Sequence, residues 1–350
     1  MYSKLLPSLL FCVSTSLLFI SCGKEETEVV PHYGLQKTVD RDSITRKPTK
    51  MEKSTKIAYE STLNGGYDIY TINADGTNLK QLTRNMEKNR FPTWSPDGSK
   101  IIFSSSRNRK TSFEFFIMNA DGSNHTRLPF VKGWCGRPGW SPDGKKVLFD
   151  AGLKGNFEIF TMNLDGTDLV NISNNPSWDG MADWSPDGTK ILFVSNRDVD
   201  HEIFVMNTDG TNVIKLTDNE YKDTTPSWSP DGTQIVFVSD RDHKFEVEVK
   251  PLSKDEDPGS PEFLERAMQS KRDHDIFVMN ADGSNPVNIT RYPNNDFKPT
   301  WSPDGTRIAF ISIRDGKREL FSMNSDGSEV VPITNNDSMD EYPDWGPMPK

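Results

Sequence analysis

The sequence predicts an all-β protein: a six-bladed β-propeller of four-stranded blades, closed by a C-terminal strand that joins the N-terminal blade. Three observations predict this fold. The motif Trp-Ser-Pro-Asp-Gly occurs five times in the 350 residues. A second motif, Asn-x-Asp-Gly-Ser/Thr, occurs six times in phase with it. Successive repeat tryptophans are 46, 44, 44, 73 and 44 residues apart, and a period of about 40 to 45 residues rich in short strands is typical of propeller blades.

Each repeat is predicted to form four antiparallel strands in chain order. The first strand ends at the tryptophan, and Ser-Pro-Asp-Gly then forms a tight turn, in which proline fixes φ and glycine supplies the left-handed residue. Second strands are expected at residues 56–59, 100–103, 146–149, 190–193, 234–237 and 307–310. The third strand leads into the Asp-Gly turn of the second motif, and the fourth strand follows that turn. Such a meander is one propeller blade.

The two ends of the repeat region are expected to complete one blade together. The N-terminal repeat has strands two to four but no first strand. Tyr342 to Pro347 carries a degenerate motif, Trp345-Gly346-Pro347, with no second strand after it. We expect this segment to supply the missing strand, because an open ring would leave free strand edges.

The two motifs, recurring in phase over residues 56 to about 347, resemble those of the TolB-type propeller family with WD40-like PD40 repeats. The resemblance implies a six-bladed propeller with a scaffold role. In TolB the propeller binds a peptidoglycan-associated lipoprotein, so such a protein is an implied partner here. TolB has a further α/β domain ahead of its propeller, where this chain has only a signal-like segment and a tether.

The N-terminus is predicted to direct export. Residues 1–21 contain no acidic residue and an apolar run from Leu5 to Ile20, which is typical of a signal peptide. The following Cys22 lies in Phe19-Ile20-Ser21-Cys22-Gly23, which resembles the lipobox of bacterial lipoproteins. The resemblance implies lipidation of Cys22 and a membrane contact through that lipid anchor.

Residues 22–55 are charged and without periodicity, so they are predicted to be a flexible tether. The propeller then occupies residues 56–350. Gly23 is not the inner-membrane retention residue of enteric bacteria, which is Asp, so the outer membrane of a bacterial envelope is favoured. The periplasmic and the surface-exposed side both stay open.

The composition argues against several classes of function. The net charge of −10 opposes binding to nucleic acid. The five histidines are scattered and no Cys-x-x-Cys occurs, so no metal and no cofactor are expected. Cys135 has no partner once Cys12 leaves with the signal and Cys22 carries lipid, so no disulfide is expected. The protein is expected to be a monomer.

The working face is predicted from connection lengths. Because turns of a meander alternate between strand ends, both Asp-Gly turns share one face, here called the turn face. All length variation lies between strands two and three, on the opposite or variable face, and includes an insertion at about residues 244–272. Insertions that decorate one face favour it as the binding surface. The insertion itself is either part of that surface or a tolerated loop.

An acidic residue opens the third strand of every blade: Asp68, Glu114, Glu158, Glu202, Asp275 and Glu319. Four blades also carry an arginine just after strand two: Arg107, Arg197, Arg241 and Arg314. A structural salt bridge between the two sets is the favoured interpretation. The alternative is a carboxylate ring that attracts a cation or a basic partner.

Two tryptophans stand outside the repeat motif. Trp134 and Trp178 each lie six residues before a repeat tryptophan, in consecutive fourth-to-first connections. Aromatic anchors are enriched in binding hot spots, whereas packing between adjacent loops is the alternative. The predicted partner-binding residues at the variable face and channel mouth are Trp134, Arg137, Trp178, Met181, Arg90, Lys298 and Tyr342.

These features predict a non-catalytic, lipid-anchored envelope protein whose propeller binds a protein or peptide. The alternatives are a glycan-binding module and a polysaccharide-processing enzyme of the propeller lyase type. Lyases of that kind hold a metal with clustered histidines, which this sequence lacks. Gly139-Trp140-Ser141-Pro142-Asp143 superficially matches a nucleophile elbow, but its Ser-Pro-Asp-Gly recurs as a turn in the other copies.

Overall fold

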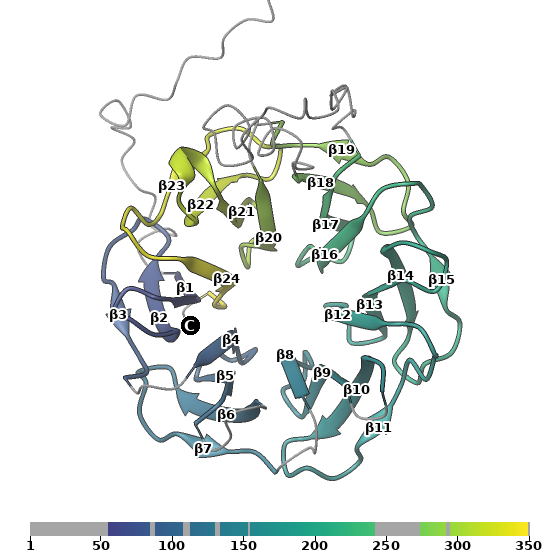
Figure 1. The fold of residues 1–350 in the computed structure, drawn as a ribbon, viewed down its shortest axis with the longest axis horizontal. Helices are drawn as coiled ribbons and strands as arrows, with labels where there is room; N and C mark the ends of the chain where they lie inside the picture. Colours follow the sequence, from purple (N-terminus) through teal and green to yellow (C-terminus); the bar gives the residue numbers. More distant parts are fainter. Residues whose placement is uncertain are drawn as a thin grey trace, which may run out of the picture. The chain divides into compact units, whose positions relative to one another are not determined.

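A computed structural model of the chain describes residues 55–84, 88–107, 113–129, 134–152, 155–241, 274–291 and 295–348. These residues form six four-stranded antiparallel sheets around a central axis (Figure 1). The predicted six-bladed, all-β propeller is therefore confirmed. The signal peptide, Cys22, the tether up to residue 54 and the insertion at 244–272 lie outside the described residues.

Each blade runs from an innermost strand to a two-residue outermost strand (Figure 1). Blade 1 comprises β24 (Asp340–Trp345), β1 (Lys56–Ser61), β2 (Asp68–Asn73) and β3 (Lys80–Gln81). Blade 2 comprises β4 (Asn89–Trp94), β5 (Lys100–Ser105), β6 (Glu114–Asn119) and β7 (Thr126–Arg127). Blade 3 comprises β8 (Trp134–Trp140), β9 (Lys146–Gly152), β10 (Glu158–Asn163) and β11 (Val170–Asn171).

Blade 4 comprises β12 (Asp179–Trp184), β13 (Lys190–Ser195), β14 (Glu202–Asn207) and β15 (Ile214–Lys215). Blade 5 comprises β16 (Asp223–Trp228), β17 (Gln234–Ser239), β18 (Asp275–Asn280) and β19 (Val287–Asn288). Blade 6 comprises β20 (Asp296–Trp301), β21 (Arg307–Ser312), β22 (Glu319–Asn324) and β23 (Val331–Pro332), with the 3-10 turn η1 (Arg314–Gly316) between β21 and β22. Within the described ranges, no helix has the length and apolar character needed to cross a membrane.

The Ser-Pro-Asp-Gly turn is held by its own side chains. In blade 2, the Ser95 hydroxyl donates to Asp97 Oδ1 at 2.7 Å, and the Ser99 amide donates to the same oxygen at 3.0 Å. The glycine that closes the turn, Gly98, has φ of 70°. The same serine–aspartate bond recurs in the four other copies. The predicted left-handed glycine and the hairpin are therefore both confirmed.

The second Asp-Gly turn needs glycine for a further reason. Gly210 has φ of 84°, and a Cβ atom there would lie 2.2 Å from the carbonyl oxygen of Ile172 in the preceding blade. Only glycine permits this approach, since real Cβ contacts are never so short. The glycine of this turn thus permits both the hairpin and the close approach of the neighbouring blade.

The core of each blade contains an aromatic pair between its second and third strands. Ring centroids lie 5.6 Å apart in Phe193–Phe204 and 5.9 Å apart in Tyr59–Tyr70. The other blades repeat the pair as Phe103–Phe116, Phe149–Phe160, Phe237–Phe277 and Phe310–Phe321. These rings are buried and pack between sheets, so the burial of apolar area holds each blade to its neighbours.

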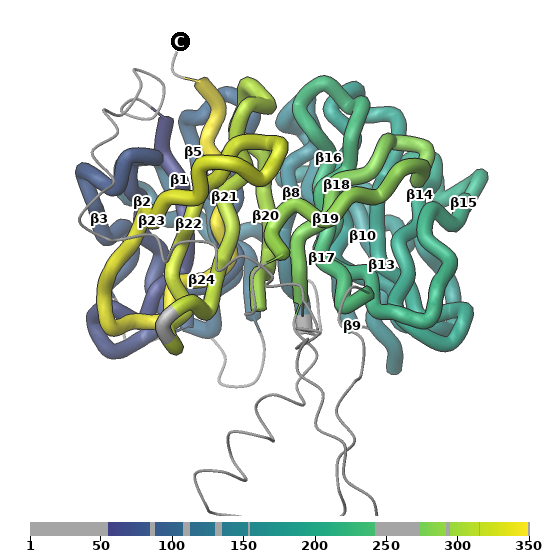
Figure 2. The backbone as a smooth tube through the Cα atoms, turned by 90° about the horizontal axis from the view of Figure 1, so that it is seen from above, coloured from purple at the N-terminus to yellow at the C-terminus, as the bar shows by residue number. Residues whose placement is uncertain are grey.

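The ring closes through the C-terminal strand. β24 pairs antiparallel with β1, and Trp345 lies opposite Ile57. The Gly346 amide donates to the Lys56 carbonyl at 2.8 Å. Trp345 is buried, so the predicted completion of the N-terminal blade by the C-terminal strand is confirmed. The strands of all blades run between the same two faces (Figure 2).

Candidate functional site

Every innermost strand contains a β-bulge at the same place in the repeat, where its pairing with the second strand shifts register. The residue three positions before each tryptophan has φ between 46° and 56°. Such a backbone is strained for a residue with a side chain and persists where the surroundings enforce it. These residues form the bulge ring: Phe91, Arg137, Met181, Thr225, Lys298 and Tyr342.

The bulge ring contains four of the seven predicted binding residues, namely Arg137, Met181, Lys298 and Tyr342. Sequence reasoning missed Phe91 and Thr225. A proline follows the ring residue in five of the six blades, and proline within a sheet is confined to edges and bulges because it has no N–H to donate. The recurring Pro-x-Trp was thus the signal that would have located the whole ring.

Bulge-ring side chains from four blades meet near the propeller axis. The rings of Phe91 and Tyr342 are perpendicular, with centroids 4.4 Å apart. The Lys298 ammonium lies 3.4 Å from the centroid of Tyr342, and the Arg137 guanidinium lies 5.8 Å from that of Phe91. Together with Arg90 these four residues form what we call the axial cluster.

Buried carboxylates hold the cations of the axial cluster in place. Arg90 donates to Glu60 Oε1 through Nε at 2.8 Å and through Nη2 at 2.6 Å. The second Glu60 oxygen accepts the backbone N–H of Phe91 at 2.9 Å, which fixes the bulge. Arg137 Nη1 donates to Asp150 at 2.9 Å. Both carboxylates are buried, so each guanidinium is held in position by a hydrogen bond on its buried side.

Glu341 is shared by three cations. Its carboxylate lies 3.0 Å from Arg90 Nη2 and 3.4 Å from Lys298 Nζ, and it also accepts a hydrogen bond from Arg318. Burial alone would raise the pKa of Glu341, but the positive charges of Lys298, Arg318 and Arg90 outweigh burial and hold the pKa below its usual value. Glu341 is therefore ionised at neutral pH and remains outnumbered by its cations.

The predicted acidic residues each make a hydrogen bond or ion pair within the fold. Asp68 accepts from the Thr83 hydroxyl at 2.6 Å, and Glu202 accepts from the Asn219 amide at 2.7 Å. Glu114 pairs with Arg127 at 2.7 Å. The remaining three act in the same way: Glu158 accepts from Ser173, Asp275 from Asn288 and Glu319 from the Asn336 amide. Each ties the start of a third strand to a neighbouring segment.

The expected salt bridges between the post-strand-two arginines and these acidic residues are wrong for two blades, and in a third blade Arg314 lies 3.5 Å from Asp296, which opens the innermost strand. Arg197 pairs with Asp179 at 3.1 Å and Arg241 with Asp223 at 2.6 Å. Both aspartates open the innermost strand. The arginine bends back across the aromatic pair of its own blade, so it reaches the first strand rather than the third; the Arg197 guanidinium, for example, lies 4.9 Å from the Phe204 centroid.

Of the two extra tryptophans, Trp134 lies outside the predicted fourth-to-first connection, whereas Trp178 lies within the predicted one, between β11 and β12. Trp134 is the first residue of β8, opposite Gly152, rather than part of a connection, and its side chain lies outside the described residues. Trp178 precedes β12, and its partly exposed ring lies edge-on to His201, with centroids 5.3 Å apart. It also covers Gly180, where a Cβ atom would meet it at 2.8 Å.

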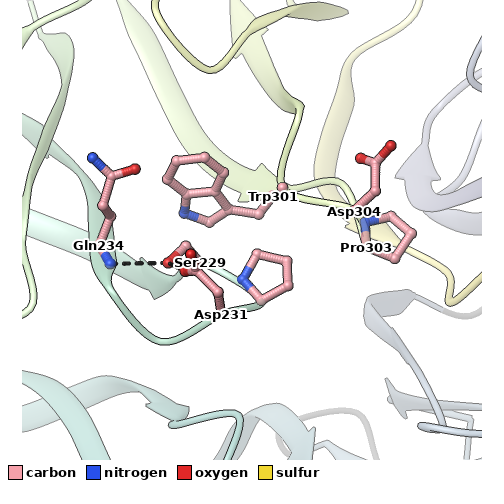
Figure 3. Close-up of a pocket in the computed structure, with 8 residues that line it drawn as sticks. Ser229, Asp231, Gln234, Trp301, Pro303 and Asp304 are labelled. Carbon is pink, nitrogen blue, oxygen red and sulfur yellow. Dashed lines mark hydrogen bonds between the residues drawn. The ribbon is translucent and has the colours of Figure 1, made fainter.

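Two grooves lie on the turn face between neighbouring blades. One, of about 350 Å³, lies between Trp301 of blade 6 and the turn of blade 5 that contains Ser229 and Asp231 (Figure 3). The other, of about 590 Å³, includes Trp140 and Pro96. Both are lined largely by the repeat motif itself, so they follow from blade packing. Among the described residues, no group of three or more His, Cys, Asp or Glu side chains is placed to hold a metal ion.

Comparisons with solved structures show the fold. TolB from Acinetobacter baumannii superposes with a TM-score of 0.66 and 21% identity, covering 85% of this chain and 67% of that protein. Oligogalacturonate lyase in complex with manganese gives a TM-score of 0.53 and 15% identity, covering 82% and 76%. The same architecture is therefore found in a TolB protein and in a lyase.

Sequence relatives match over short stretches. Tol-Pal system protein TolB of Escherichia fergusonii is 36% identical over 47 residues, which are 13% of this chain and 11% of that protein. Dipeptidyl-peptidase 5 of Porphyromonas gingivalis is 39% identical over 51 residues, which are 15% of this chain and 8% of that protein. The aligned parts thus span far less than two thirds of either relative.

A family model covers much more of the chain. Residues 129–259 and 258–350 match PD40, described as the TolB beta propeller domain. The matched region includes four of the five complete Trp-Ser-Pro-Asp-Gly copies and the closing strand. The chain belongs to the TolB beta propeller family.

Proposed function

We propose that this protein is a non-catalytic, lipid-anchored scaffold of the bacterial cell envelope whose propeller binds a protein or peptide. The binding surface is the variable face together with the axial cluster. The observation that supports this most is the bulge ring, because its strained backbone directs large side chains from neighbouring blades to one place. A peptidoglycan-associated lipoprotein is the partner that membership of the TolB family suggests.

The likeness to oligogalacturonate lyase shows the fold and nothing of the chemistry, because identity is only 15%. The axial cluster contains two arginines that are paired with carboxylates, a lysine and two aromatic rings. Their contacts serve recognition, since Arg90 and Arg137 are both committed to buried carboxylates. We therefore favour binding over catalysis at this site.

The partner-binding role is tested by replacing Trp134 and Trp178 with alanine together. The double variant is expected to bind the partner at least about 2 kcal/mol more weakly, as for an aromatic hot spot. Crosslinking in intact envelopes should therefore capture less of the partner. The melting temperature should fall less than in Trp94→Ala, because Trp94 is a buried repeat tryptophan whereas Trp178 is partly exposed.

Thr208→Lys, on the turn face, is the matched control and should leave capture unchanged. If Thr208→Lys abolishes capture while the double tryptophan variant captures normally, the working face lies at the other end of the propeller. If the double variant unfolds as readily as Trp94→Ala, the two tryptophans are structural.

The anchoring role is tested by Cys22→Ala. The variant is expected to move from the membrane to the soluble fraction after cell fractionation, because stable anchoring needs more than one acyl chain and an export signal provides none. Cys135→Ala controls for loss of a thiol elsewhere, since Cys135 is buried in blade 3. Unchanged membrane partition of Cys22→Ala would contradict the lipoprotein assignment.

A further inference from the structure

The axial cluster presents cations outward and keeps its carboxylates inside. The side chains of Arg137, Arg90 and Lys298 are 27%, 23% and 20% exposed. The carboxylates that pair with them, Asp150, Glu60 and Glu341, are 1%, 0% and 6% exposed. A molecule arriving at this end of the axis therefore meets positive charge, although the whole chain carries −10.

The cations also outnumber the carboxylates. Arg90, Lys298, Arg318 and Arg137 face three buried acids, Glu60, Glu341 and Asp150. One positive charge is left over. Lys298 is the cation least committed to an acid, because its 3.4 Å contact with Glu341 competes with two arginines on the same carboxylate. An incoming single negative charge would balance the cluster.

The aromatic rings of the cluster are already covered. Lys298 lies over the face of Tyr342, and Phe91 meets Tyr342 at an interplanar angle of 83°. A sugar needs a free aromatic face on which to stack, and this ring offers little of one. The cluster is therefore better suited to a carboxylate that accepts hydrogen bonds from Lys298 and the guanidinium groups.

We propose that the axial cluster binds an aspartate or glutamate side chain in an acidic segment of the protein partner, with Lys298 as its principal cation. The inference rests on the proposed partner-binding function and names the chemistry that the site selects. Arg137 and Arg90, fixed by Asp150 and Glu60, supply further positive charge.

The test uses the purified propeller chain and a display library of random 12-residue peptides, with bound sequences counted before and after selection. Enrichment of Asp and Glu is expected, and a selected acidic peptide should bind about tenfold more weakly to Lys298→Gln. Lys298→Arg should restore most of the affinity. Binding should also weaken as salt rises, because partly exposed charge pairs are screened.

Lys145→Gln is the matched control, since Lys145 is an exposed lysine on the turn face, and it should bind like the unchanged protein. Lys298→Gln leaves Glu341 paired with Arg90 and Arg318, so its melting temperature should be unchanged. Arg137→Gln is a poorer test, because it would leave Asp150 buried without its cation.

Three results would overturn the inference. Selected peptides that lack acidic residues but still require the axial cluster would show a partner site of different chemistry, and the proposed function would stand. Acidic peptides that bind Lys298→Gln and Lys298→Arg alike would place their site elsewhere. An oligogalacturonate that binds through Lys298 when no peptide does would replace the peptide with an acidic glycan, and the proposed partner-binding function would then fail as well.

Discussion

Removal of residues 340–350 is expected to unfold the whole propeller, with a loss of about 5 kcal/mol or more in the free energy of unfolding. The deletion removes β24, so β1 loses every partner on its inner edge. It also removes the buried Trp345, and burial of one such side chain is worth about 3–5 kcal/mol. A typical domain has only about 5–15 kcal/mol in total.

The loss should spread beyond blade 1, because β24 also contacts the next blade. Asp344 accepts the backbone N–H of Trp94 at 2.7 Å, and a Cβ atom on Gly98 would meet Pro347 at 3.0 Å. Urea unfolding followed by circular dichroism measures the effect. A chain ending at Met348 is the control and should behave like the full chain.

A rearranged chain separates loss of the strand from loss of the ring closure. Trp345 lies opposite Ile57, as Trp94 lies opposite Ile101. Residues 338–345 placed ahead of Lys56 through the linker Ser-Pro-Asp-Gly-Thr would therefore form an ordinary hairpin in the same register. This chain should recover most of the stability. A deletion variant that melts like the full chain would show that closure does not depend on β24.

The parts of the fold that the sequence predicted well are those in which local chemistry and repetition agree. Each Ser-Pro-Asp-Gly contains the side chains that hydrogen-bond within its turn and its own left-handed glycine. Each of the five copies therefore predicts the same hairpin independently. Ring closure followed from counting strands. Neither inference required knowledge of distant contacts.

The candidate site was harder to predict because it depends on backbone geometry and on contacts between blades. Phe91 and Thr225 share no side-chain chemistry with Lys298, yet the bulge places all three at equivalent positions. The arginine partners were misassigned for a similar reason. Spacing placed Arg197 near Glu202, whereas packing against Phe193 and Phe204 directs it to Asp179.

Asp344→Asn is expected to stabilise the protein at pH 8 and to leave it nearly unchanged at pH 4. Burial raises the pKa of Asp344 to about 7, helped by the nearby charge of Asp183 and opposed by the Trp94 N–H. An aspartate in an unfolded chain has a pKa of about 3.9. The folded protein therefore binds the extra proton between about pH 4 and pH 7, and its free energy of unfolding falls as pH rises through that range.

Asparagine keeps an oxygen that can accept the Trp94 N–H but never ionises, so this fall should disappear in the variant. A shift of about three pKa units sets an upper limit of about 4 kcal/mol at pH 8. The measurement is urea unfolding of both proteins at several values between pH 4 and pH 8. Asp183→Asn should reduce the effect in part, because Asp183 is one cause of the raised pKa of Asp344.

Asp187→Asn provides a control of opposite sign. The Ser185 hydroxyl and the Thr189 N–H lower the pKa of this turn aspartate, so its stabilising contribution is present at neutral pH and is lost as pH falls. The variant should be less stable than the unchanged protein at pH 8, and the difference should shrink towards low pH. Two results would contradict the prediction: a free energy of unfolding of Asp344→Asn that differs from that of the unchanged protein by the same amount at every pH, or one that is the lower of the two at pH 8. Either result would show that ionised Asp344 does not destabilise the folded protein.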